Sequence, residues 1–130
     1  MKFSIVVLGA PYSSQSPSSA LAFTRAALES GHGIYRLFFY LDGVHNGSAL
    51  AVPPQDEVHI PRAWQTLILE HQIDAVVCAA SALKRGLLDA GEAERYDRMG
   101  ASLLDGFLIS GLGQLVDASL NSDRVISFPA

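Results

Sequence analysis

The stretch that decides the fold is Ile73 to Cys78, which reads IDAVVC and ends in the only cysteine of the chain. Similar short runs occupy residues 3–8 (FSIVVL), 34–40 (IYRLFFY), 107–110 and 124–128. The strongest of these runs are mostly apolar and do not alternate regularly with polar residues, as is typical of strands buried on both faces of a parallel sheet. The sequence therefore predicts five strands at these positions.

Helical patterns separate the predicted strands. Helices are expected from Pro17 to about Gly31, from about residue 60, at 79–85 and at 111–121, with residues 87–106 helical in part. Ser16 is expected to cap the first helix, and His71 to lie on the apolar face of the second. Because strands and helices alternate, we predict a three-layer α/β/α fold with a five-stranded, mainly parallel sheet. Residues 1–130 are expected to form one domain.

The bulk composition is that of an ordinary globular protein. Hydrophobic residues make up 49% of the 130 residues and charged residues 17%, and the formal net charge is −4. An acidic chain is poorly suited to binding phosphate backbones, so direct nucleic-acid binding is disfavoured. The apolar runs are too short for a signal peptide or for a membrane span of about 20 residues. We therefore expect a cytoplasmic protein that does not bind membranes, and a single cysteine agrees with a reducing compartment.

The candidate functional site lies at the carboxyl ends of the strands, where open parallel α/β sheets bind their ligands. Cys78 ends its strand and a short helix follows at once, so unsatisfied backbone N–H groups are expected to stabilise a thiolate there. Lys84 and Arg85 would add positive charge if the segment folds back toward the sulfur. Tyr12 and Ser13 follow the first strand and are candidate hydrogen-bond donors at the same site.

The residues alone also support competing interpretations. A lone cysteine after apolar residues is usually an inert, buried side chain, and the residues by themselves favour this interpretation for Cys78. No metal site is predicted, because the four histidines are scattered and no pair has metal-ligand spacing. Gly111 and Gly113 open a helix without the full dinucleotide fingerprint, which favours a simple tight turn. A nucleotide-binding flavodoxin-like domain is disfavoured, since no phosphate-binding glycine loop follows the first strand.

Short segments in a fixed order carry a resemblance to a known family. They are Phe38-Phe39-Tyr40, Asp42-Gly43-Val44, Arg62-Ala63-Trp64, Val77-Cys78-Ala79-Ala80, Arg85-Gly86, Ile109-Ser110-Gly111-Leu112-Gly113-Gln114-Leu115 and Asp123-Arg124-Val125. With these segments the chain resembles the DsrE/TusD branch of the DsrE/DsrF family of sulfur-relay proteins. The resemblance implies a sulfurtransferase that holds sulfane sulfur as a persulfide on Cys78, which stands where the family's active cysteine follows a central strand.

The resemblance also implies partners. The chain would be one subunit of a heterohexamer with TusB- and TusC-like, or DsrF- and DsrH-like, sister chains. Sulfur would arrive from a TusA-like donor and leave to a TusE- or DsrC-like acceptor, without a metal or organic cofactor. Its destination would be the wobble 2-thiouridine of tRNA or, as the alternative, dissimilatory sulfur oxidation. A third interpretation is a noncatalytic assembly subunit, and the presence of Cys78 argues against it.

Overall fold

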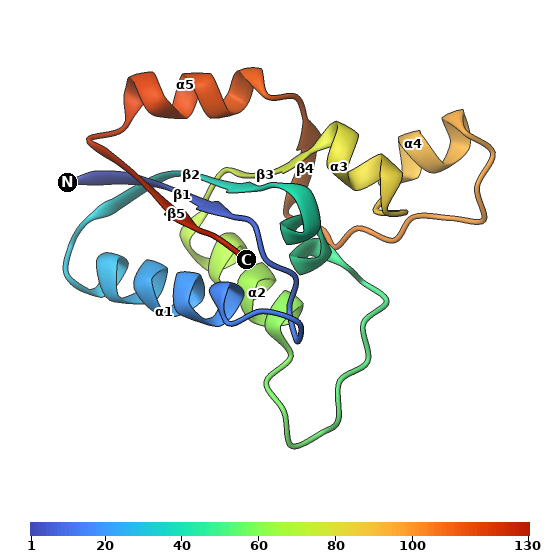
Figure 1. The fold of residues 1–130 in the computed structure, drawn as a ribbon, viewed down its shortest axis with the longest axis horizontal. Coiled ribbons are helices and arrows are strands. Elements are labelled where there is room, and N and C mark those ends of the chain that lie inside the picture. Colours follow the sequence, from blue (N-terminus) through green and yellow to red (C-terminus); the bar gives the residue numbers. More distant parts are fainter.

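The computed structural model describes residues 1–130 and shows alternating strands and helices (Figure 1). The elements are β1 Lys2–Val7, α1 Ser16–Glu29, β2 Gly33–Phe39, the 3₁₀ helix η1 Leu41–Gly47, α2 Ile60–His71, β3 Ala75–Cys78, α3 Ala79–Lys84, α4 Ala90–Arg95, β4 Phe107–Ser110, α5 Gly113–Asn121 and β5 Arg124–Phe128. Every predicted strand is present within two residues of its expected bounds. No helix has both the length and the apolar character that a bilayer crossing requires.

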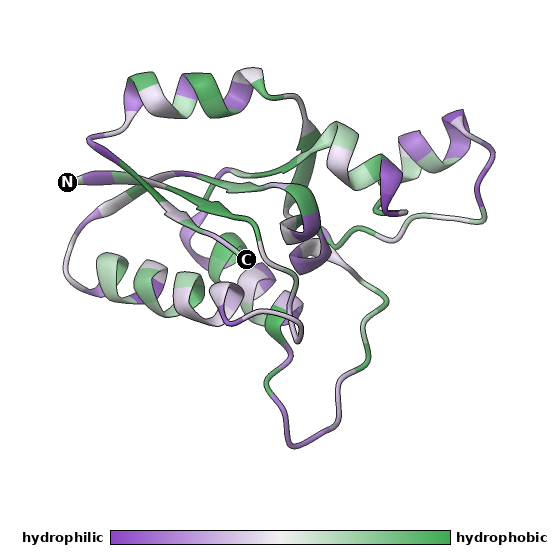
Figure 2. Ribbon diagram, viewed as in Figure 1, coloured by the Kyte–Doolittle hydropathy of each residue, from purple (hydrophilic) through white to green (hydrophobic).

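The five strands form one sheet in the order β4-β3-β2-β1-β5. All four pairings are parallel, which confirms the predicted fold class and makes the sheet wholly parallel. Helices α1 and α2 cover one face, and α5 lies over the other (Figure 1). The order places β3, with Cys78 at its end, between β2 and β4. Figure 2 shows that the central strands are hydrophobic, as strands covered on both faces must be.

The main core lies between the sheet and helices α1 and α2, where 18 buried residues form one cluster. Trp64 of α2 is fully buried and packs edge-on against Phe39, with ring centroids 5.3 Å apart. Its indole Nε1–H donates to Oδ1 of Asn46 at 3.1 Å, so this large side chain is buried without leaving a polar atom unpaired. Because a buried tryptophan contributes much apolar area, α2 is fixed firmly to the sheet.

Helix η1 is held close to the end of β1. The Asn46 amide donates to the carbonyl oxygens of Gly9 and Gly43, at 3.1 and 2.8 Å. A Cβ atom at Gly43 would lie 2.0 Å from the Val7 carbonyl oxygen, so only glycine permits this close approach of backbone to backbone. The turn after β2 is thereby fixed over the carboxyl edge of the sheet.

The opposite face is thinner. Its buried apolar cluster consists of Val6, Phe38, Val76 and Cys78, with Leu8, Tyr40 and Leu115 packed against it. An ion network also attaches α5 to the sheet. The nearly buried Arg36 donates from Nε to Asp74 at 2.7 Å, and from Nη1 to the Gln114 carbonyl at 2.8 Å and to Asp117 at 2.9 Å.

Two expectations about the helices are wrong. His71 is exposed, because the buried face of α2 ends with Leu67 and Ile68 and the helix stops at His71 itself. Ser16 does not cap α1: the cap position is Gln15, and the buried Ser16 hydroxyl has no hydrogen-bond partner. The turn before the helix satisfies one of its first backbone N–H groups, since the Ser14 hydroxyl accepts the backbone N–H of Ser16 at 3.1 Å.

Candidate active site around Cys78

The position of Cys78 follows from the way β3 ends. Cys78 is the last residue of β3, lies opposite Ser110 of β4, and directly precedes the first residue of α3. Its backbone is extended, with φ −61° and ψ 123°, so the chain turns from strand to helix immediately after the cysteine. The thiol therefore lies at the carboxyl edge of the sheet, where parallel α/β folds bind ligands.

Cys78 has two different surroundings. The residue is only 2% exposed, and it packs against the apolar side chains of Val6, Phe38 and Val76. It also lines a cavity of about 190 Å³. The other lining residues are Tyr40, Leu41, Ala80, Ser81, Lys84, Arg85 and Leu112. The cavity is several times larger than the roughly 30 Å³ that one water molecule occupies in the liquid, so the thiol borders space that another group can enter.

The two predicted cations both line this cavity, but only one is free of a counter-ion. Arg85 donates from Nε to Asp42 at 2.8 Å and from Nη1 to the Ser81 carbonyl at 3.2 Å. The hydrogen bond from Arg85 holds the pKa of Asp42 below its ordinary value. Lys84 is exposed and forms no ion pair. Lys84 is thus the cavity-lining cation without a counter-ion from this chain.

One side of the cavity is fixed by two links between η1 and α3. The backbone N–H of Leu41 donates to the Ser81 hydroxyl at 3.1 Å, and Asp42 pairs with Arg85. Leu41 has a φ of 53°, a conformation that costs energy for a residue with a side chain and needs such support. Sequence reasoning missed Leu41 and Ser81, although their position after β2 and β3 was a usable signal.

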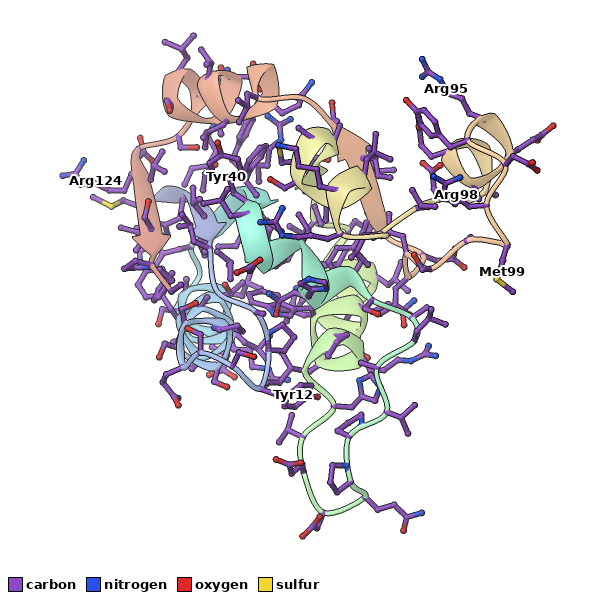
Figure 3. The ribbon with its side chains drawn as sticks, turned by 45° about the vertical axis from the view of Figure 1, so that its right-hand side comes forward. Tyr12, Tyr40, Arg95, Arg98, Met99 and Arg124 are labelled. Atoms are coloured by element: carbon purple, nitrogen blue, oxygen red, sulfur yellow. The ribbon has the colours of Figure 1, made fainter.

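Tyr12 and Ser13 are not part of this cavity, contrary to the sequence-based expectation. They line a separate cavity of about 410 Å³ together with Glu57, Val58 and Ile60. The Tyr12 hydroxyl donates to the Val58 carbonyl and accepts the Ile60 N–H, both at 3.0 Å. Figure 3 shows Tyr12 near the long segment that precedes α2, well apart from Tyr40. Tyr12 therefore holds the end of that segment, at Val58 and Ile60, through two hydrogen bonds to its backbone.

The fold and the site together define a parallel α/β protein with one cysteine at the carboxyl edge of its sheet. Its sequence matches the DsrE/DsrF-like family over residues 1–128. It is 51% identical to a sulfurtransferase TusD homolog of Pseudomonas aeruginosa, over 98% of this chain and 97% of that protein. It is 46% identical to the DsrE protein of Allochromatium vinosum, over 98% of both chains.

A solved structure supports the same relationship. The YchN protein of E. coli superposes with a TM-score of 0.77 and 26% identity, covering 98% of this chain and 99% of that chain. The chain belongs to the DsrE/DsrF-like family. It is a sulfurtransferase of the sulfur-relay type, and members of this family work with partner subunits.

Proposed function

We propose that the protein carries sulfane sulfur as a persulfide on Cys78 and passes it to a cysteine of a partner protein. The observation that carries this proposal is the cavity that the only cysteine shares with Lys84, a lysine without an ion-pair partner. A thiolate is the nucleophilic form of cysteine, and a nearby cation without a counter-ion stabilises it. The sulfurtransferase names of the relatives agree with this chemistry.

The proposed reaction is thiol exchange, and it involves no net oxidation or reduction of the donor and Cys78 taken together. The Cys78 thiolate attacks the outer sulfur of a donor persulfide, a new S–S bond forms on Cys78, and the donor leaves as a thiolate. An acceptor thiolate then attacks the outer sulfur on Cys78, and the Cys78 thiolate is released. Neither step needs a metal or an organic cofactor. A single cysteine suits this role, because no second thiol is present to expel the sulfur by closing a disulfide.

The neighbouring residues have separate roles in the proposal. Lys84 stabilises the anionic thiolate and persulfide through its charge. Arg85 acts as a positioning residue, since its pair with Asp42 fixes η1 beside the cavity. Tyr40 and Leu112 contribute to the wall of the cavity, and a partner that covers this cavity would exclude water from the sulfur. A drier surrounding strengthens the attraction between the sulfur anion and the ammonium group.

For the destination of the sulfur we propose the relay that makes the wobble 2-thiouridine of tRNA, in the cytoplasm. The TusD names of the relatives at 51% and 48% identity favour it. Dissimilatory sulfur oxidation is the second candidate, because the DsrE relative is 46% identical. In either pathway the chain would assemble with TusB- and TusC-like, or DsrF- and DsrH-like, sisters into a heterohexamer. A TusA-like donor would load it, and a TusE- or DsrC-like acceptor would unload it.

The test is to incubate the protein with a persulfide-loaded TusA-like donor and to measure the mass of the intact chain by mass spectrometry. We expect a mass increase of one sulfur atom on the wild type and none on Cys78→Ser. Lys84→Gln is expected to slow loading, and Lys84→Arg to preserve most of the rate because it keeps the charge. Sulfur transfer by Cys78→Ser in the reconstituted relay would show that Cys78 is structural and would end the proposal. Loss of 2-thiouridine in cells without the gene would separate the tRNA pathway from sulfur oxidation.

A further inference from the structure

A second cavity shares a lining residue with the Cys78 cavity and has no role in the proposed sulfur exchange. Its volume is about 390 Å³, and it lies between the end of α3 and the residues that follow α4. The lining residues are Leu83, Lys84, Gly86, Leu88, Tyr96 and Arg98. Lys84 lines both this cavity and the one that holds Cys78. The two cavities therefore meet at one lysine side chain.

The second cavity combines apolar walls with positive charge. Leu83, Leu88 and Tyr96 supply the walls, and Lys84 and Arg98 are the only charged residues that line it. Neither cation forms an ion pair, and the Arg98 guanidinium donates only to the Tyr96 carbonyl at 2.8 Å. The cavity is thus a local site of unneutralised positive charge on a chain whose formal net charge is −4.

The acidic residues of α4 do not cancel this charge. Glu92 and Glu94 are absent from the lining, and Glu92 already pairs with Arg95 at 3.9 Å. Figure 3 shows Arg95 and Arg98 at one end of the molecule, with Arg124 at the opposite end. Because neither Lys84 nor Arg98 is engaged in an ion pair, both remain free to pair with a carboxylate of a partner.

We propose that this second cavity receives the cysteine-bearing segment of the protein that exchanges sulfur with Cys78, and that it selects a carboxylate in that segment. The inference rests on the proposed function, because a protein thiol or persulfide must reach Cys78. A segment that reaches Cys78 past Lys84 lies along both cavities. Its apolar part contacts Leu83 and Leu88, and its carboxylate pairs with Lys84 and Arg98.

The geometry sets the spacing of the two groups in the partner. Cys78 directly precedes α3 and Lys84 is the last residue of that helix, so about 9 Å of helix rise separates their backbones at 1.5 Å per residue. An extended chain spans about 3.3 Å per residue. The acidic residue of the partner is therefore expected about three positions from its exchanging cysteine.

The binding test uses fluorescently labelled seven-residue peptides with serine at the centre, which cannot exchange sulfur. One peptide carries aspartate three positions from the centre on both sides, and its matched controls carry asparagine or lysine there. We expect the aspartate peptide to bind about two- to tenfold more tightly than the asparagine peptide at low salt, with the preference falling as salt rises. Arg98→Glu should abolish that preference and make the lysine peptide the better ligand. Arg124→Glu, a matched charge reversal far from the cavity, should leave the preference unchanged.

Equal affinities for the aspartate and asparagine peptides, undetectable binding included, would overturn the inference. A preference that survives both Lys84→Glu and Arg98→Glu would also overturn it, because the carboxylate would then bind elsewhere. A second assay separates this inference from the proposed function. It uses the same peptides with a cysteine persulfide at the centre, and the readout is the mass of the intact chain. A binding preference without sulfur transfer to Cys78 would refute the persulfide function and leave the acidic-segment site in place.

Discussion

The two faces of the sheet differ in what they contain. Helices α1 and α2 cover 18 buried residues on one face, whereas the cluster under α5 has four, and Cys78 is one of them. On the thick face, Trp64 and Asn46 join α2 and η1 through a buried hydrogen bond. On the thin face, Arg36 attaches α5 through an ion pair with Asp117 and a hydrogen bond to the Gln114 carbonyl. The comparison indicates that most of the buried apolar side chains lie on one face, while Cys78, the proposed sulfur carrier, lies on the other.

The largest loss of stability is expected when the largest buried side chain of the thick face, Trp64, is removed. Trp64→Ala is expected to lower the free energy of unfolding by about 3–5 kcal/mol, since it empties a fully buried site. The measurement is urea unfolding followed by circular dichroism. Trp64→Phe is the matched variant: it keeps an aromatic ring but leaves Asn46 Oδ1 without its donor, at a cost of about 1–3 kcal/mol. An alanine variant as stable as the wild type would contradict the division between the faces.

A smaller effect is expected from the ion network on the thin face. Arg36→Met should lower the free energy of unfolding by about 1–3 kcal/mol, because Asp74 and Asp117 lose their shared donor. Water limits the cost, since the two carboxylate side chains remain 36% and 43% exposed. Arg124→Met removes a similar but exposed side chain and should change stability by less than about 0.5 kcal/mol. If both variants lose the same stability, Arg36 has no special role in holding α5.

The smallest expected effect is on the stability of the protein at acidic pH. The hydrogen bonds from Tyr35 and Arg36 hold the pKa of Asp117 below its ordinary value. A carboxyl with a lowered folded pKa contributes stability above the unfolded pKa of about 3.9, and that contribution disappears as the pH falls through the folded pKa. We therefore expect Asp117→Asn to lower stability at pH 7 and to lose less stability than the wild type when the pH drops below about 4. Parallel pH profiles for the two proteins would refute this assignment.

The sequence predicted the secondary structure well because the signals are local. The apolar runs at 34–40 and 73–78 identify strands without any knowledge of their neighbours. The same argument placed Cys78 at the carboxyl edge, since the end of a strand can be read directly from the chain. The order of the strands depends on contacts between distant segments and did not follow from these patterns.

The parts that were missed depend on such distant contacts. Tyr12 has a φ of 72°, and its hydroxyl binds the backbone at Val58 and Ile60. Nothing near Tyr12 in the sequence indicates that partner. The same holds for Arg36, a charge inside an apolar strand whose carboxylate partners come from residues 74 and 117. A lone charge in such a strand signals a buried ion pair, but the strand order is needed to find the partners.

The near-complete burial of Cys78 affects how long a loaded carrier would keep its cargo. Small thiols in solution can remove the outer sulfur from a persulfide that is open to solvent, and the rate of this loss rises with their concentration. At 2% exposure, such molecules must first enter the cavity that Cys78 lines, so spontaneous loss would depend on how often the sulfur becomes accessible there. A partner that holds its own thiol in this cavity would react with the outer sulfur each time it becomes accessible. The depth of one side chain would thus make delivery faster than leakage.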